Sequence, residues 1–272
     1  MKGRAFATCG PTFSRIGDEY ERRYGLSYKH LAALSEKAFK NAKHNPRAQT
    51  RGWSLTPESF QQDDKHNPVI EGRVRRQDCS QVTDGGAAVV LCSATFLERY
   101  LTRRSLPRSK IARILGWAHT TSPLPLEPKL GRNDDGYLFP EVRRTIVQAM
   151  RRAGVTHVRE LSGIETHDCF TITEYMAIDH FGITEPGQSW RAIEDGTLER
   201  GGSLPMNPSG GLVGGGHPVG ASGVRMVLDA ARQVTGQAED NQVEQASRFG
   251  TLNLGGALAT LVSFVIGNAA EA

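Results

Sequence analysis

The strongest chemical signal in the sequence is a histidine held in a glycine-rich segment. His217 lies between Gly216 and Pro218, inside a stretch from residue 207 to 223 that is rich in glycine. Glycine lets the backbone approach a ligand closely and adopt positive φ angles. A histidine fixed just before a predicted helix is suited to act as a general base near neutral pH. Glycine loops before helices also bind phosphates, and some only turn the chain, so spacing alone leaves these roles open.

A second signal is the run His-Asp-Cys-Phe at residues 167–170, at the end of a predicted strand. A cysteine two residues from a histidine is a pattern that serves acid/base or nucleophilic chemistry. The alternative is a buried small thiol, Cys169, beside a structural histidine, His167. Taken alone, the pattern favours that structural alternative.

The elements that must position these residues alternate along the chain. Apolar spacing predicts helices over 27–43, 141–153, 173–180 and 221–234, and strands over 111–119, 158–170, 250–254 and 258–266. The apolar run 87–92 follows a turn and predicts a further, buried strand. Ser93 is then expected to cap the helix that comes next. Strands alternating with helices predict a layered α/β fold.

Bulk properties exclude several classes of protein. The 272 residues are 38% apolar, enough for a sizeable core, and the longest apolar run, 258–266, is too short to span a bilayer. No secretory signal is visible, and the four cysteines have neither disulfide nor metal-ligand spacing, so we expect a cytoplasmic protein with reduced thiols.

The charge is mildly basic. A net charge of +4 does not call for a nucleic-acid partner. Basic residues cluster locally, either as solvated surface or to attract an anionic cofactor: Arg73, Arg75, Arg76, Arg103, Arg104, Arg108, Lys110 and Arg113.

Three motifs in order resemble the thiolase superfamily, and within it the sterol-carrier-protein-type branch. Residues 78–88 are similar to the Ser-x-x-x-Asp-Gly-Ala-Ala segment that ends the family's amino-terminal half. The His-Asp-Cys-Phe run matches the motif of that branch, and residues 210–223 match its Gly-His-Pro segment. Residues 20–25 resemble the start of the branch's loop-domain helices.

The resemblance implies a role for each site residue. The family forms or splits carbon–carbon bonds next to a coenzyme A (CoA) thioester. His217 would pair with the nucleophile, His167 would line an oxyanion site, and Cys169 would be the acid/base for the substrate α-carbon. CoA would enter as substrate or product rather than as a tightly bound cofactor, and no metal is implied. The expected CoA contacts are Ser80, Gly216, Asn253 and Gly255.

Two departures from the family pattern stand out. The late Cys-x-Gly motif falls on Asn253 and Gly255, and asparagine cannot transfer the proton that the cysteine transfers. The nucleophile's Cys-x-Ser segment finds no match, and Cys9 does not fit it. We therefore expect a loop-domain-like helical region over 1–70, the end of an incomplete amino-terminal domain over 71–104, and a complete carboxy-terminal domain over 105–272.

These observations leave three functional hypotheses. The first is a thiolase-like acyltransferase acting on acyl-CoA, either truncated or completed by a partner chain. The second is a non-catalytic CoA-binding subunit, and the third is a retro-aldol lyase of the same branch. The resemblance also implies a homo-oligomer or a partner chain that supplies the missing part.

Overall fold

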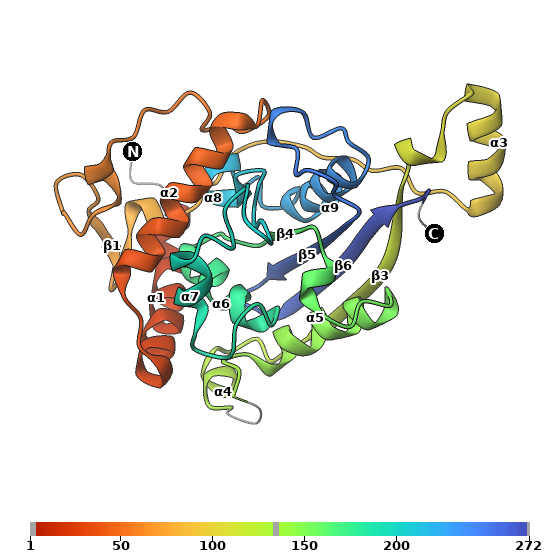
Figure 1. Ribbon diagram of the computed structural model, residues 1–272. Coiled ribbons are helices and arrows are strands. Elements are labelled where there is room, and N and C mark those ends of the chain that lie inside the picture. The colour runs from red at the N-terminus through yellow and green to blue at the C-terminus, as the bar shows by residue number, and fades with distance from the viewer. Residues whose placement is uncertain (1–3, 133–135, 271–272) are drawn as a thin grey trace.

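The structure, a computed structural model, describes residues 4–132 and 136–270, except for the side chains of residues 4–9 (Figure 1). The helices are α1 (Arg4–Tyr24), α2 (Tyr28–His44), α3 (Ala94–Arg104), α4 (Glu127–Leu130), α5 (Pro140–Arg152), α6 (Thr171–His180), α7 (Ser189–Glu194), α8 (Gly211–Gly215) and α9 (Ser222–Val234). The strands are β1 (Val69–Glu71), β2 (Val74–Arg75), β3 (Ala112–Thr121), β4 (Gly163–Thr166), β5 (Arg248–Gly255) and β6 (Thr260–Asn268).

Most of the predicted elements are confirmed. Helices α2, α5, α6 and α9 and strands β3, β5 and β6 lie where the apolar spacing places them, and Ser93 caps α3 by accepting a hydrogen bond from the backbone of Phe96. The predicted strand over 158–170 is shorter than expected. A single turn occupies 158–160, and only β4 pairs in the sheet.

A four-stranded mixed sheet forms the centre of the molecule, in the order β3-β6-β5-β4. Only the β4–β5 pair is parallel. Val265 of β6 belongs to the apolar cluster that contains Ile146 of α5, whereas Ile266 packs with Ala230 of α9. Successive strand side chains point to opposite faces, so α5 and α9 cover the two faces of the sheet (Figure 1). The α/β layered fold is thus confirmed.

The two N-terminal helices share the apolar core of the sheet region. Phe13, Ile16 and Tyr20 of α1 and Leu34 of α2 are buried in the same cluster as the residues of α5 and α6. Helix α2 also approaches α8 closely. The approach is so close that a Cβ atom at Gly214 would collide with the backbone oxygen of Ala38. The expected boundaries at 70 and 104 stay predictions.

The predicted buried strand over 87–92 is wrong. The chain there is extended but unpaired with any strand of the described residues, and the side chain of Val90 is 94% exposed. Figure 1 shows this stretch leading to α3, which projects from the rest of the molecule. An apolar run forms a buried strand only where a neighbouring strand takes up its backbone hydrogen bonds, and the described part of the chain places no such strand beside it. We call residues 84–104 the projecting arm.

Among the described helices, none is both long and apolar enough to cross a membrane.

Candidate active site

The parallel β4–β5 pair brings His167 beside Asn253. Thr166, the last residue of β4, pairs with Leu252, and the backbone N–H of His167 donates to the Leu252 oxygen at 2.9 Å. The next residues of the two segments are therefore neighbours. The amide Nδ2 of Asn253 lies 3.2 Å from Nδ1 of His167. The pairing of distant strands, rather than local spacing, creates this contact.

The glycine-rich segment folds into the short helix α8 and then presents His217. Gly216 has φ of +91°, a conformation that residues with a side chain rarely adopt, and a Cβ atom there would lie 2.9 Å from the Gln49 side chain. The segment was expected to be a loop, so α8 is an addition to the predicted elements. His217 lies just upstream of α9, separated from Ser222 by residues 218–221, as its motif predicts.

One extended stretch, residues 79–83, joins the two motifs. The backbone N–H of Ser80 donates to the oxygen of Cys169 at 2.9 Å, and the N–H of His217 donates to the oxygen of Gln81 at 2.8 Å. Thr83 closes the pairing by donating to the oxygen of His217 at 3.3 Å. All three sequence motifs therefore meet at one place.

The two imidazole rings face each other edge to face. Their centroids are 5.3 Å apart and their planes cross at 86°. Nδ1 of His217 lies 2.7 Å from Oγ of Ser222, whose single hydroxyl hydrogen is donated to the oxygen of Pro218. Both contacts are hydrogen bonds only if Ser222 accepts from Nδ1–H, and this arrangement leaves the lone pair of His217 on Nε2. A neutral histidine with a free Nε2 is a competent general base.

Burial keeps both rings neutral. It lowers the pKa of His217 to about 4, with a further contribution from the positive charge of Arg225. It lowers the pKa of His167 to about 3, helped by His217 and Arg225. Arg225 lies on α9, and its Nη2 donates to the oxygen of Gly211 at 2.8 Å. At neutral pH both histidines therefore accept or donate single hydrogen bonds without a charge of their own.

Asp168, which carried no predicted role, orients the glycine-rich segment. Its carboxylate accepts hydrogen bonds from the backbone N–H groups of Leu212, at 2.6 Å, and Val213, at 3.2 Å. Burial and the nearby Glu174 raise the pKa of Asp168 to about 7. The His-Asp-Cys-Phe motif thus holds the loop that carries His217.

A second buried carboxyl supports the same segment. Glu165 accepts from the hydroxyl of Ser209 at 2.7 Å and from its N–H at 3.1 Å, and burial raises the pKa of Glu165 to about 8. Four residues of the site were not predicted from the sequence: Glu165, Asp168, Ser222 and Arg225. Glu165 on β4 and Arg225 on α9 occupy ordinary strand and helix positions that no local pattern singles out. Asp168 and Ser222 lie inside recognised motifs, residues 167–170 and 210–223, but neither was given a role.

The other predicted site residues are placed as follows. Cys169 is buried, and Ser80 is only 1% exposed. Gly255 ends β5, two residues beyond Asn253. Contact of these residues with CoA, and the proton-transfer role of Cys169, stay predictions.

The remaining thiols and cations lie elsewhere. Cys79 is buried, and burial raises the pKa of its thiol well above the usual range. Cys92 is exposed on the projecting arm, and the side chain of Cys9 lies outside the described residues. Several members of the basic clusters form ion pairs with carboxylates: Arg73 with Asp18, Arg75 with Asp64, and Arg108 with Glu98.

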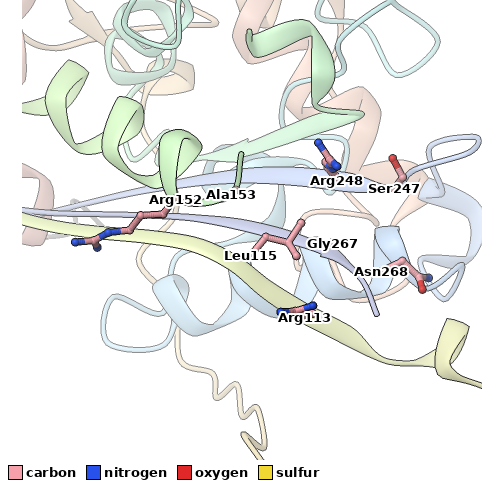
Figure 2. Close-up of a pocket in the computed structure, with 8 residues that line it drawn as sticks. All are labelled: Arg113, Leu115, Arg152, Ala153, Ser247, Arg248, Gly267 and Asn268. Carbon is pink, nitrogen blue, oxygen red and sulfur yellow. The ribbon is translucent and has the colours of Figure 1, made fainter. Parts of the chain in front are cut away.

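A separate cavity of about 260 Å³ carries three arginines but no acid/base pair (Figure 2). The guanidinium of Arg152 is already engaged, because Nη1 donates to the oxygen of Trp117 at 2.6 Å and the group stacks on the Trp117 ring. Figure 2 shows the three guanidinium groups pointing in different directions. The lining residues are Arg113, Leu115, Arg152, Ala153, Ser247, Arg248, Gly267 and Asn268.

Comparison with known proteins addresses the family of the chain. Residues 129–268 match the family model described as thiolase C-terminal domain-like. The chain is 31% identical over 261 residues to an acetyl-CoA acetyltransferase of Methanothermobacter thermautotrophicus, covering 91% of this chain and 61% of that protein. It is 28% identical over 249 residues to human sterol carrier protein 2, covering 89% of this chain and 42% of that protein.

A solved structure has the same fold. The Ltp2-ChsH2(DUF35) aldolase aligns with a TM-score of 0.78 at 24% identity, covering 97% of this chain and 63% of that one. The chain thus spans less than two thirds of the length of each of these proteins. The family model covers more than half of the chain, over β4, β5, β6 and the loop that carries His217. The chain therefore belongs to the thiolase C-terminal domain-like family.

Proposed function

We propose that this chain supplies the carboxy-terminal half of a thiolase-type site that forms or cleaves a carbon–carbon bond next to a CoA thioester. The observation that carries the proposal is the pair of neutral, buried histidines. His217 keeps a free Nε2 lone pair, and His167 lies edge to face with it at 5.3 Å. In this proposal His217 Nε2 takes the proton of an incoming thiol, and His167 contributes to the group that holds the thioester oxygen.

The thiol itself is expected to come from another polypeptide segment. None of the thiols whose side chains are described is a candidate. Cys79 is buried with a raised pKa, Cys92 lies on the projecting arm, and Cys169 is assigned by resemblance to the α-carbon. Acyl transfer through a nucleophilic cysteine is thus expected only when this chain is assembled with the segment that carries the thiol. The chain alone is expected to bind substrate without turnover.

The test is CoA-dependent cleavage of a 3-ketoacyl-CoA by the protein isolated from its source together with whatever co-purifies. Products are separated by chromatography. The substitution His217→Ala should lower kcat by about 10²- to 10⁴-fold, the usual contribution of a positioned acid/base. His119→Ala is the matched control, because His119 is exposed on the edge strand β3, and it should leave the rate unchanged. Full activity of His217→Ala would refute the proposed base.

A retro-aldol lyase is the second candidate, favoured by the fold shared with the aldolase. The two reactions differ in stoichiometry. Thiolysis consumes one CoA for each bond cleaved, whereas retro-aldol cleavage of a β-hydroxyacyl thioester consumes none and needs no acylated cysteine. Product formation from a β-hydroxyacyl-CoA without added CoA would therefore favour the lyase. Binding of CoA by calorimetry, without turnover of either substrate in any assembled form, would favour a non-catalytic subunit.

The projecting arm is the surface that we propose receives the partner. Val90 is 94% exposed, Leu91 is 74% exposed, and the backbone beside them pairs with no described strand. A chain of different sequence that adds a strand here would cover these side chains and take up the free backbone groups. The two-component name of the similar aldolase agrees with such an arrangement.

Association can be followed directly. Val90→Asp should abolish co-purification of the partner, while Val147→Asp, a matched change at a half-exposed valine on α5, should not. Cys92 is an exposed thiol on the arm and offers a cross-linking position. A cross-linked product with the mass of two copies of this chain would contradict the heteromeric partner.

A further inference from the structure

We infer that Asn253 is a positioning residue that fixes the hydrogen of the His167 ring on Nε2, and so makes His167 a hydrogen-bond donor to the reacting thioester. The inference rests on the proposed function for what the donor acts upon. That Asn253 sets the tautomer of His167 follows from the contacts of Asn253 alone. The residue occupies the position where the family resemblance places a proton-transferring cysteine.

The direction of the Asn253–His167 hydrogen bond follows from the atoms involved. An amide nitrogen only donates, so Nδ1 of His167, 3.2 Å from Nδ2 of Asn253, must accept. Nδ2 is also 3.8 Å from the Sδ atom of Met226, and a thioether sulfur carries no hydrogen and only accepts. The two N–H groups of the amide thus point at two acceptors. This arrangement would be lost if the amide were turned over.

Helix α9 provides the surface against which the side-chain amide of Asn253 packs. A Cβ atom at Gly223 would lie 3.4 Å from both Cγ and Oδ1 of Asn253, so the amide lies flat against a helix position that has no side chain. Strand β5 supplies Asn253, and the helix that follows the Gly-His-Pro loop supplies the surface behind it. Asn253 is therefore held by the same helix whose first residue, Ser222, orients His217.

The rings of His217 and His167 are consequently held in opposite tautomers. Ser222 leaves His217 with its hydrogen on Nδ1 and a lone pair on Nε2. Asn253 leaves His167 with a lone pair on Nδ1 and its hydrogen on Nε2. One ring is thereby prepared to take a proton, and the other to donate a hydrogen bond without releasing one. A donor aimed where negative charge develops stabilises the transition state more than the ground state.

The tautomers can be read by nuclear magnetic resonance of the full chain labelled with ¹⁵N-histidine. Two-bond ¹H–¹⁵N correlations at neutral pH distinguish the protonated from the unprotonated ring nitrogen. The signals of His167 are assigned by their loss in His167→Gln. We expect the hydrogen of His167 on Nε2 and that of His217 on Nδ1. A wild-type spectrum with the His167 hydrogen on Nδ1 would overturn the inference by itself.

Variants at Asn253 make the test causal. In Asn253→Asp a carboxylate, which only accepts, replaces the donating amide. The hydrogen of His167 should therefore move to Nδ1, the ring nitrogen that faces the carboxylate. Met226→Leu removes the sulfur acceptor, with a branched hydrocarbon in its place, but leaves the Asn253–His167 contact, so the tautomer should be unchanged. If Asn253→Asp folds, shown by unchanged signals of the other histidines, and His167 keeps its hydrogen on Nε2, the inference is wrong. If it does not fold, Asn253→Ala, which offers neither donor nor acceptor, should give a mixture of tautomers. A single Nε2–H form in that variant would refute the role.

Activity separates this inference from the proposed function. In an assembled form that turns over, Asn253→Asp should lower kcat by about 10²- to 10³-fold with little change in KM, as the loss of an oxyanion donor does. Unchanged kcat with a switched tautomer would refute the positioning role while the function stands. The absence of turnover in every assembled form would refute the function, and the tautomer result would still decide whether Asn253 orients His167.

Discussion

The buried ion pair between Lys37 and Glu174 offers the sharpest test of how the N-terminal helices are held. Nζ of Lys37 on α2 lies 2.6 Å from the carboxylate of Glu174 on α6, and both side chains are at most 3% exposed. Nζ also donates to the backbone oxygen of Met206 at 2.6 Å. The pair joins residues 137 positions apart. Replacing Lys37 by methionine keeps the length of the side chain and removes the charge.

The expected cost follows from what the substitution leaves behind. Glu174 would remain buried without its cation, and breaking a buried pair by removing one partner costs about 3–5 kcal/mol. For a chain of this size that corresponds to a fall in Tm of roughly 6 to 20 °C. The double variant Lys37→Met/Glu174→Leu removes both charges, so its free energy of unfolding should return to within about 2 kcal/mol of the wild type.

A matched exposed pair on the same helix provides the control. Nζ of Lys29 lies at the same distance, 2.6 Å, from Glu194, but the side chains are 67% and 43% exposed. Because water screens such a pair, Lys29→Met should cost less than about 1 kcal/mol. Free energies of unfolding are measured by urea denaturation with circular dichroism, and the transition must be shown to be two-state before they are compared.

Two results would refute this reasoning. A loss below about 1 kcal/mol for Lys37→Met would mean that α2 is not fastened to α6 through this pair. A double variant as unstable as the single one would mean that the destabilisation comes from repacking around the introduced methionine rather than from the stranded carboxylate. Either outcome would also weaken the view that α2 is an integral part of the core beneath the site.

Three further predictions concern the groups that surround the site. The pKa of Glu165 is raised to about 8, so between pH 4.5 and 8 the folded state keeps a proton that the unfolded state has lost, and the free energy of unfolding falls as pH rises. Relative to wild type, the free energy of unfolding of Glu165→Gln should therefore increase by up to about 1.4 kcal/mol per pH unit across that window. A pH-independent difference in urea denaturation would contradict this. Tyr20→Phe removes the hydroxyl that donates to the buried Asp179 at 2.6 Å, and should lower the free energy of unfolding by about 1.5–3 kcal/mol; an unchanged value would show that the carboxylate finds another donor. Gly214→Ala should cost about 1–3 kcal/mol in the same assay, because the new methyl group would press on the backbone of α2 at Ala38, and wild-type stability would mean that α8 moves away freely.

Local patterns in the sequence were sufficient to predict most elements of the fold. Helix α5 is predicted by apolar residues at helical spacing and by Gly154, which adopts φ of +69° just beyond its end. Helix α3 begins where Ser93 predicts. Such signals depend on neighbours within a few positions along the chain, and they survive folding because the same local hydrogen bonds and spacings are used in the folded state. The Gly-His-Pro motif is readable for the same reason, since Gly216 and Pro218 restrict the backbone on either side of His217.

Local patterns do not predict the structure of a segment that depends on a distant neighbour. The run 87–92 has the composition of a buried strand, yet Val90 is exposed, because burial needs a strand alongside that the described residues do not provide. Composition reports the tendency to be buried. It does not report whether something covers the segment.

By itself the sequence determined the order and type of the main elements, the family, and His217, His167 and Cys169 as candidate site residues. Only the tertiary structure decided how the two histidines are set. The parallel register of β4 and β5 places Asn253 on Nδ1 of His167, and the first turn of α9 places Ser222 on Nδ1 of His217. Burial beside Arg225 then keeps both rings uncharged. Hydrogen-bond direction and pKa depend on atoms brought together from positions far apart in the chain, and strand register and packing, which the sequence does not display locally, control that proximity.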